Sequence, residues 1–380
     1  MTLLPNSMPC QTMPNQRYKI GQDLLLSCLI NPHSVTGFTV PQWSLLLRMA
    51  KTCKLTAHIA WLIEQHNLGH CIPAKVVNHF QAAQAIVVYR RRIAFWEMNR
   101  LQRALADCNI DIIVLKGCAY LLTDIPFANA RLFSDVDILV EKSAIDHIEQ
   151  SLLAQNWQTL TLDDYDQSYY RLWMHEIPPL RHVSRTMEVD IHHAIIPPTS
   201  DLQPNPMLLI LDAIGLDNSR FKILSPCDMV LHSAVHLFFD SDLSNKLRDL
   251  VDLDQLLKYF DARNVGFFEK LLKRAEVLGL QRPLYYTLRY SHQLLATPIS
   301  NDILQRSQIS APCTPIKMLM DALIPLALLP EHPDESSQTV RFARWLLYVR
   351  SHYLRMPLKL LIPHLARKSL MRFTSVQSVN

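Results

Sequence analysis

The spacing of apolar residues predicts helices in the first third of the chain and in its second half. From position 41 to 60, apolar side chains recur every three or four residues, which is the spacing of one helix face. A second predicted helix runs from about 74 to 108, and its predicted inner face consists of Ala85, Val88, Trp96 and Leu105. Further helices are predicted at about 226–239, 245–260, 266–278 and 283–296.

Between these helices the pattern changes to short runs of β-branched and apolar residues. Strands are predicted at 110–115, 134–140 and 187–192, with a helix at 141–156. A cluster of prolines then marks a boundary, at Pro197, Pro198, Pro204 and Pro206. We therefore expect a helix-rich α+β fold. Its expected parts are a partly disordered extension at 1–39, a helical region at 40–109, a strand-containing core at 110–206 and a C-terminal helical domain at 207–380.

Glycine is unusually scarce. The 380 residues include 7 glycines and 23 prolines, whereas glycine makes up about 7% of an average protein. Dinucleotide folds with a GxGxxG turn and Walker-type P-loops both need clustered glycines, so the scarcity excludes both classes of nucleotide site. It also argues against an all-β protein with many tight turns.

Neither the net charge nor the cysteine pattern indicates a particular class of binding partner or metal site. The 38 Lys and Arg residues exceed the 34 Asp and Glu residues by only four, which is too little to indicate nucleic-acid binding. The 8 cysteines include no CxxC pair, so neither a disulfide framework nor a Cys-rich zinc site is expected. There is no secretory signal pattern and no run of 18 uncharged apolar residues, so we expect a cytoplasmic protein without membrane insertion.

Paired acids on the second predicted strand form the first candidate site. Asp135 and Asp137 are separated by one residue, so both side chains leave the same face of a strand, while Val136 and Ile138 enter the core. Two neighbouring carboxylates raise each other's pKa unless a positive charge lies between them. A divalent cation such as Mg²⁺ is the usual partner of such oxygen ligands.

The third predicted strand repeats this arrangement. It carries Glu188, Asp190 and His192 on one face. If the sheet places this strand beside the second, a third carboxylate joins the pair, and three acids can hold the two cations used in nucleotidyl transfer. At the end of the first strand, Lys116 adds a compact positive charge and Gly117 leaves room for a phosphate.

These motifs, in this order, resemble the uncharacterised nucleotidyltransferase family of the DNA polymerase β-like superfamily. In that superfamily a Gly-Ser turn follows a strand, a DxD pair comes next and a third acid lies on a later strand. This chain has Cys118 in place of the serine, so the hydroxyl group that would contact the γ-phosphate is absent from this position. The resemblance covers about residues 40–260 and is carried by Ile113 to Gly117, Arg131, Ser134 to Val140 and Val189 to His192, with Pro41-Gln42-Trp43 and Lys246 to Leu253 in the flanking helices.

The resemblance implies a small mixed β-sheet core that transfers a nucleoside monophosphate from an NTP to an acceptor hydroxyl. ATP is the expected NTP, Mg²⁺ or Mn²⁺ the expected cofactor, and a small molecule, peptide or protein the expected acceptor, with nucleic acid not expected. Asp135 and Asp137 would bind two metals, and Asp190 would bind the catalytic metal and help deprotonate the acceptor. The implied nucleotide-binding residues are Lys116, Gly117, Arg131 and Ser134, and Glu188 and His192 would lie just behind the metal ligands.

Two other classes of function remain open. A glycosyltransferase can use a DxD pair to hold a metal-bound nucleotide sugar, although Lys116, Gly117 and Asp190 would then have no role. A catalytically silent binding or accessory protein of a biosynthetic locus would retain the same residues.

Several charged residues outside the strands have competing interpretations. His232 and His236 have the spacing of a metal pair on a helix, but no HExxH glutamate and no third ligand accompany them, so we interpret them as structural. His175 and Glu176 are assigned to a loop that overhangs the site. Ion pairs between neighbouring helical turns explain Arg248, Asp249 and Asp252 nearly as well as contact with a nucleotide does.

Overall fold

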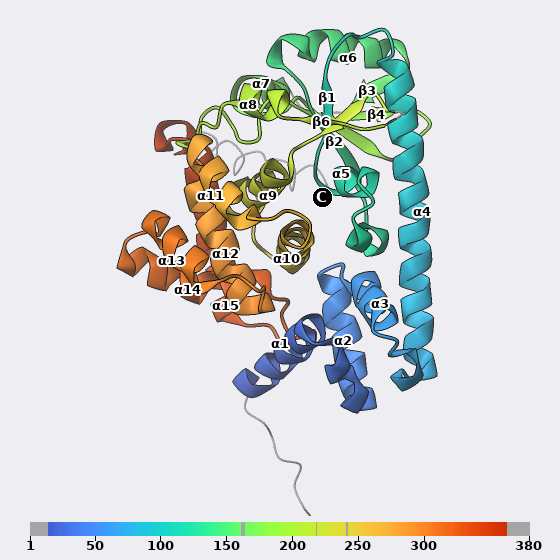
Figure 1. Ribbon diagram of the computed structural model, residues 1–380, viewed down its shortest axis with the longest axis vertical. Coiled ribbons are helices and arrows are strands. Elements are labelled where there is room, and N and C mark those ends of the chain that lie inside the picture. The colour runs from blue at the N-terminus through green and yellow to red at the C-terminus, as the bar shows by residue number, and fades with distance from the viewer. Residues whose placement is uncertain (1–13, 161–163, 218, 241, 363–380) are drawn as a thin grey trace, which may run out of the picture.

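A computed structural model describes residues 14–160, 164–217, 219–240 and 242–362, and it confirms the helix-rich α+β fold (Figure 1). Within these ranges one mixed sheet of seven short strands has the order β3-β4-β5-β2-β1-β7-β6. The sheet lies at the top of Figure 1, the N-terminal helices at the bottom and the C-terminal helices to the left. Residues 1–13 of the predicted N-terminal extension and residues 363–380 of the predicted C-terminal domain lie outside the described ranges.

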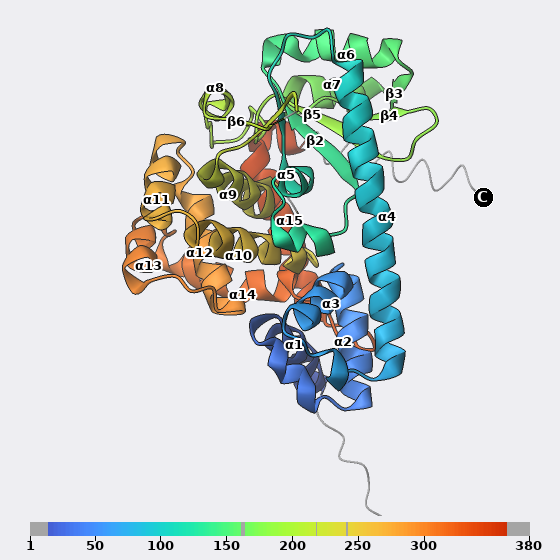
Figure 2. The ribbon, with the colours of Figure 1, turned by 45° about the vertical axis from the view of Figure 1, so that its right-hand side comes forward.

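The N-terminal region forms a group of helices with a long helix leading away from it. Helix α2 begins after Thr39, whose N–H donates to Gln42 Oε1 (2.8 Å), and Pro41 occupies its first turn. Helix α4 runs from this group to the sheet (Figure 2). The elements are α1 (Pro14–Ile30), η1 (Pro32–Gly37), α2 (Val40–Thr52), α3 (Thr56–Gln65), η2 (Gly69–Cys71) and α4 (Ala74–Ala104).

The predicted inner face of α4 is wrong except at its end. Leu105 is buried, but Val88 and Trp96 are 41% and 56% exposed, and Ala85 is exposed as well. The buried face includes Val87, Ala94 and Glu97, and Glu97 accepts a hydrogen bond from Arg185 Nε (2.6 Å). A pattern based on hydrophobicity excludes a glutamate from the core, so it could not assign Glu97 to the buried face.

The three predicted strands are present and form the centre of the sheet. They are β1 (Ile112–Val114), β2 (Asp135–Leu139) and β5 (Glu188–His192). Strand β2 pairs antiparallel with β1 and parallel with β5. The elements between them are α5 (Lys116–Leu122), η3 (Pro126–Ala130), η4 (Lys142–Ala144), α6 (Ile145–Ala154), β3 (Trp157–Thr159), α7 (Asp164–Trp173) and β4 (Leu180–His182).

The sheet continues beyond the expected end of the core at residue 206. After α8 (Pro206–Leu211), β6 (Ile214–Gly215) pairs with β7 (Phe221–Ile223), and β7 is parallel to β1. Part of the predicted C-terminal helical domain therefore belongs to the sheet.

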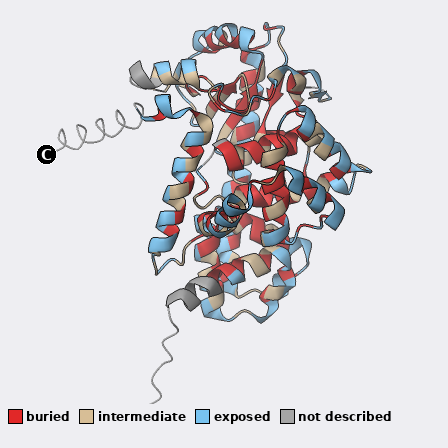
Figure 3. Ribbon diagram, turned by 90° about the vertical axis from the view of Figure 1, so that its left-hand side faces the viewer, coloured by how far each residue is buried: buried red, intermediate tan, exposed pale blue. Residues whose placement is uncertain are grey.

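The C-terminal helices pack around α9 and α12. Ser225 caps α9 by accepting from the Asp228 N–H, with Pro226 in the first turn. Buried residues gather along the inner sides of these helices, while their outer turns are exposed (Figure 3). The elements are α9 (Pro226–Val235), the π-helical η5 (His236–Asp240), α10 (Leu247–Asp261), α11 (Phe267–Val277), α12 (Gln281–Leu295), α13 (Asn301–Ser307), η6 (Gln308–Ser310), α14 (Thr314–Leu328) and α15 (Gln338–Arg355).

A helix that crosses a bilayer needs about 20 consecutive, mostly apolar residues. Among the described residues, no single helix is long and apolar enough to cross a membrane. The segments Asn301–Ser310 and Thr314–Leu328 reach that length and composition only as a pair, and they are bent by 116°.

A buried ion pair joins the sheet region to the C-terminal helices. Arg131 Nε donates to Asp252 Oδ2 on α10 (2.7 Å), and the two side chains are only 12% and 8% exposed. The Arg131 guanidinium also packs over Gly117 and occupies the space that a Cβ atom would need there. The scarce glycine at this turn is therefore required by the position of Arg131.

We predict that Arg131→Ala lowers the free energy of unfolding by about 3 kcal/mol or more, because Asp252 is left buried without its partner. Arg48→Ala is the matched control, since it removes a 2.6 Å pair with Asp334 whose side chains are 44% and 58% exposed. An exposed pair of this kind contributes about 1 kcal/mol or less. Urea denaturation measures both effects, and equal losses in the two variants would contradict a structural role for the buried pair.

Candidate active site

Two neighbouring parallel strands bring the predicted acids together. Strands β2 and β5 pair in register, with Asp137 opposite Asp190 and Asp135 opposite Glu188. Residues paired in this way project from the same face of a sheet, so these carboxylates share one face. Asp137 is buried, and Asp135 and Asp190 are half-buried.

Lys116 lies against this acidic face. It is the first residue of α5, directly after β1, and its backbone has a positive φ of 47°. Its Nζ donates to Asp137 Oδ1 at 2.7 Å. Burial would lower the pKa of the lysine, but the charge of Asp137 outweighs it and raises the pKa. Lys116 is therefore a charged ammonium bound to a predicted metal ligand.

The turn that follows differs in detail from the contacts expected at a phosphate site. Gly117 is covered by the Arg131 guanidinium. The buried Cys118 thiol donates to the Asp135 backbone carbonyl (3.4 Å), so it supports β2 from behind. Ser134 is exposed at the start of β2. Of the predicted nucleotide-binding residues, Ser134 is thus exposed and Lys116 half-buried, whereas Arg131 and Gly117 pack against each other.

The buried His192 connects Asp137 to Glu176, an acid that the sequence analysis assigned to a loop. His192 Nε2 donates to Asp137 Oδ1 (3.1 Å), and its Nδ1 lies 3.3 Å from Glu176 Oε2. Burial would lower the pKa of His192, but the charge of Glu176 and the hydrogen bond to Asp137 raise it. Burial likewise opposes ionisation of Asp137, yet Lys116 and His192 hold its pKa well below the usual range.

Glu176 reaches the site through a single β-bridge to His192. Its neighbour His175 is buried, and donor atoms of His175, Glu176 and His192 lie within 4.8 Å of one another, a set that can hold a metal ion. A single β-bridge leaves no alternation of polar and apolar residues by which it could be predicted. The one signal in the sequence is the adjacent pair His175 and Glu176, which we assigned to a loop over the site without giving it a function.

Asp190 is the least compensated carboxylate of the site. Its Oδ1 atom is buried, and no described residue supplies a hydrogen-bond partner to it. Burial, followed by the charges of Asp137 and Glu176, raises its pKa to about 8. We call Asp135, Asp137, Glu176 and Asp190 the acidic centre. Lys116 and His192 lie against Asp137 and Glu176 as counter-charges, whereas no described residue donates to Asp190 Oδ1, so the centre favours an added cation.

The remaining predicted residues lie at the margin of the centre. Glu188 is half-buried and lies 3.8 Å from Arg181 on β4. His232 is buried on α9, and burial together with the nearby Lys116 holds its pKa well below the usual range. A neutral buried His232 agrees with the structural interpretation of that residue.

The family of the chain follows from its sequence comparison. A family model described as "Uncharacterised nucleotidyltransferase" matches residues 39–296, which is more than half of the chain. The chain belongs to this family. The match confirms the family predicted from the motifs and supports a general nucleotidyltransferase role.

Comparisons with individual proteins add no functional argument. No protein with a curated description matches the chain. The crystal structure of JHP933 from Helicobacter pylori matches with 12% identity, covering 77% of this chain and 97% of that chain, at a TM-score of 0.31. That similarity is too low to support a conclusion about fold or activity.

The raised pKa of Asp190 predicts a specific dependence of stability on pH. Between the ordinary carboxyl pKa of 3.8 and about 8, the folded state holds a proton that the unfolded state releases. The resulting stabilisation is fully present below pH 3.8 and is lost as the pH rises through about 8.

Asp190→Asn removes this titration. In metal-free buffer, we expect the Tm of the variant relative to wild type to increase from pH 5 to pH 9 by about 5 °C, because this titration is linked to about 4 kcal/mol and a chain of 380 residues shifts by about 1 °C per kcal/mol. Differential scanning calorimetry measures the two curves. Parallel curves would contradict a buried, proton-binding Asp190.

Proposed function

We propose that this nucleotidyltransferase family member transfers a nucleoside monophosphate from an NTP to a hydroxyl group of a small molecule, peptide or protein. ATP is the expected donor. The observation that carries the proposal is the register of β2 and β5, which sets Asp137 beside Asp190 with Asp135 on the same face. Converging carboxylates from adjacent strands are the ligand type that a metal-dependent transfer to phosphorus requires.

The acidic centre fits Mg²⁺ or Mn²⁺. Lys116 and His192 both contact Oδ1 of Asp137, so these bonds do not use its Oδ2. Asp190 Oδ1 has no hydrogen-bond partner among the described residues. Asp135, Asp137 and Asp190 would therefore hold the cofactor, with His192 and Glu176 behind them. When bound, such cations activate the attacking hydroxyl and neutralise charge on the leaving pyrophosphate.

The residues of the chain would then have separate tasks. Asp190 would lose its own proton when the cation binds beside it, and the carboxylate would then accept the proton of the acceptor hydroxyl. The hydroxyl oxygen would bond to the α-phosphorus while the bond from that phosphorus to the bridging oxygen breaks, releasing pyrophosphate. Lys116 would exchange its contact with Asp137 for a phosphate oxygen. Ser134 would contact the nucleotide, and Arg131, packed over Gly117, would fix the turn that carries Lys116.

Labelling experiments test the proposal. Purified protein is incubated in cell lysate with each of the four NTPs, labelled at the α-phosphate, and with Mg²⁺ or Mn²⁺. We expect label to enter one acceptor, and Asp135→Asn, Asp137→Asn and Asp190→Asn each to reduce labelling by about 100-fold or more. Asp146→Asn, an exposed acid on α6, is the matched control and should label like wild type.

Thermal shift measurements separate the other classes of function. Protection by UDP- or GDP-sugars but not by ATP with Mg²⁺ would replace the proposal with a glycosyltransferase. Calorimetry that detects no affinity for NTPs or Mg²⁺ would favour a silent binding protein. Unchanged labelling by correctly folded Asp→Asn variants would contradict the metal-dependent mechanism directly.

A further inference from the structure

A small cavity lies between the N-terminal helices and the start of α10. Its volume is about 230 Å³, which is less than the 300–1,000 Å³ of typical small-molecule sites and suits one group of a larger ligand. Lys54 lines it from the turn after α2, and Ser244, Asn245, Lys246 and Arg248 line it from the loop before α10 and the first turn of that helix. We call this cavity the basic pocket.

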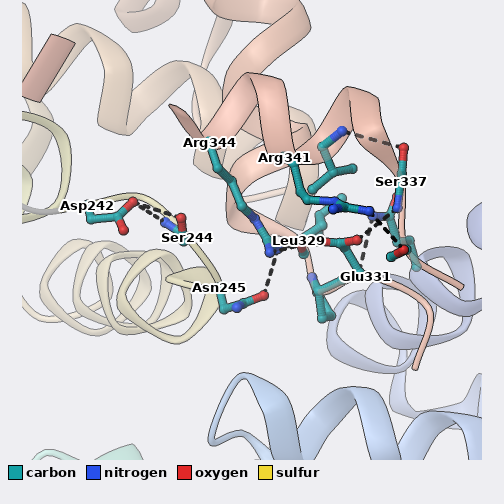
Figure 4. Close-up of polar contacts among 12 residues, drawn as sticks. Asp242, Ser244, Asn245, Leu329, Glu331, Ser337, Arg341 and Arg344 are labelled. Carbon is teal, nitrogen blue, oxygen red and sulfur yellow. Dashed lines mark hydrogen bonds and ion pairs between the residues drawn. The ribbon is translucent and has the colours of Figure 1, made fainter. Parts of the chain in front are cut away.

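Its wall is held in place by contacts from the far C-terminal helices (Figure 4). Arg344 of α15 donates through Nη2 to Asn245 Oδ1 (2.8 Å) and through Nη1 to Glu331 Oε1 (2.8 Å). Asn245 N–H donates to the Ala327 carbonyl (3.0 Å), and Asp242 accepts from Ser244. Hydrogen bonds therefore join the loop that lines the pocket to α14 and α15.

Positive charge exceeds negative charge at the pocket. Lys54, Lys246 and Arg248 face a single lining carboxylate, that of Asp249. Asp249 accepts two hydrogen bonds from Arg248 (3.0 and 2.9 Å) and lies 3.7 Å from Lys246. Among the described residues, no ion pair is formed by Lys54. Burial lowers the pKa of Lys54, and the neighbouring charges of Arg248 and Lys246 lower it further.

The pocket lies next to the acidic centre. Arg248 and Asp249 are one helical turn from Asp252, the partner of the Arg131 that covers Gly117 beside Lys116. The negative charge of Asp135 also acts on Lys54, since it raises the pKa of the ammonium against the larger lowering by burial. A ligand that spans both sites would meet carboxylates at one end and ammonium and guanidinium groups at the other.

We propose that the basic pocket binds a phosphate group of a substrate whose reacting end lies at the acidic centre. This inference rests on the proposed function, because it assigns the phosphate to a substrate of nucleotidyl transfer. A multiply charged phosphate matches the unbalanced lysines and the guanidinium of Arg248, and their fixed wall reduces the entropy lost on binding. The phosphate can belong to the triphosphate of the NTP or to a phosphorylated acceptor.

Isothermal titration calorimetry of the full chain tests the pocket without metal and without turnover. Inorganic phosphate and tripolyphosphate are titrated into wild type, Lys54→Gln and Lys246→Gln. We expect each substitution to weaken anion binding by about tenfold, the effect of losing one charge-assisted contact. Lys51→Gln is the matched control, since Lys51 is an exposed lysine on α2 outside the pocket lining and its loss changes the net charge equally.

A second titration, with ATP and Mg²⁺, identifies the source of the phosphate. If Lys54→Gln weakens the binding of this nucleotide as well, the pocket receives the triphosphate. If it weakens only inorganic phosphate or tripolyphosphate, the pocket receives a phosphate of the acceptor. Either result supports phosphate binding at the basic pocket, even if the labelling experiment detects no transfer.

The inference is overturned if Lys54→Gln and Lys246→Gln, with the Tm of wild type, bind both anions as Lys51→Gln does. The Asp→Asn labelling results would be unaffected by that outcome. Should Lys54→Gln not fold, Lys246→Gln alone decides, because its ammonium lies 3.7 Å from Asp249 rather than in a tight hydrogen bond.

Discussion

The parallel, in-register pairing of β2 with β5 is the constraint on which the rest of the site depends. Parallel neighbours cannot be joined by a tight turn, so the chain leaves β2 through α6 and returns through β3, α7 and β4. On its return it passes along the end of β5, where Glu176 bridges to His192. The crossover that the pairing requires thus delivers the partner of the histidine that holds Asp137.

The same pairing places the carboxyl groups of Asp137 and Asp190 side by side, where two negative charges would repel each other. The two groups avoid this repulsion in different ways. Asp137 is neutralised locally, by Lys116 and His192. Asp190 keeps its proton instead, since no described group donates to its buried oxygen. Away from these carboxylates, the charge of Arg131 is neutralised by its ion pair with Asp252, while the basic pocket keeps an excess of positive charge. A net charge of +4 over the whole chain says nothing of this local separation of acids from bases.

The parts of the fold that could be predicted are those with a local period. The i, i+2 spacing of Asp135 and Asp137 places both on one face wherever a strand forms, so the acidic pair needed no knowledge of the fold. The strands β3, β4, β6 and β7 have two or three residues each, are too short to show an alternation and were missed, whereas the equally short β1 was found from its continuous run of Ile and Val. On α4, the burial of Glu97 could not be predicted, because its partner Arg185 lies 88 positions away.

The sequence offered Arg248 and Asp249 as possible nucleotide contacts, but it could not show that Lys54 lies beside them, because these residues are far apart along the chain. The pocket therefore changes which part of the chain must be regarded as the binding unit. Lys54 follows α2, Arg248 lies on α10, and the wall between them is fastened by Arg344. Gln22 Nε2 donates to the Pro330 carbonyl (3.3 Å), which ties the first helix to the same C-terminal segment. A division at residues 110 and 206 follows the change from helical to strand periodicity. It would nevertheless separate the acids from every cation of the pocket, so the helices at both ends are as much part of the proposed site as the strands.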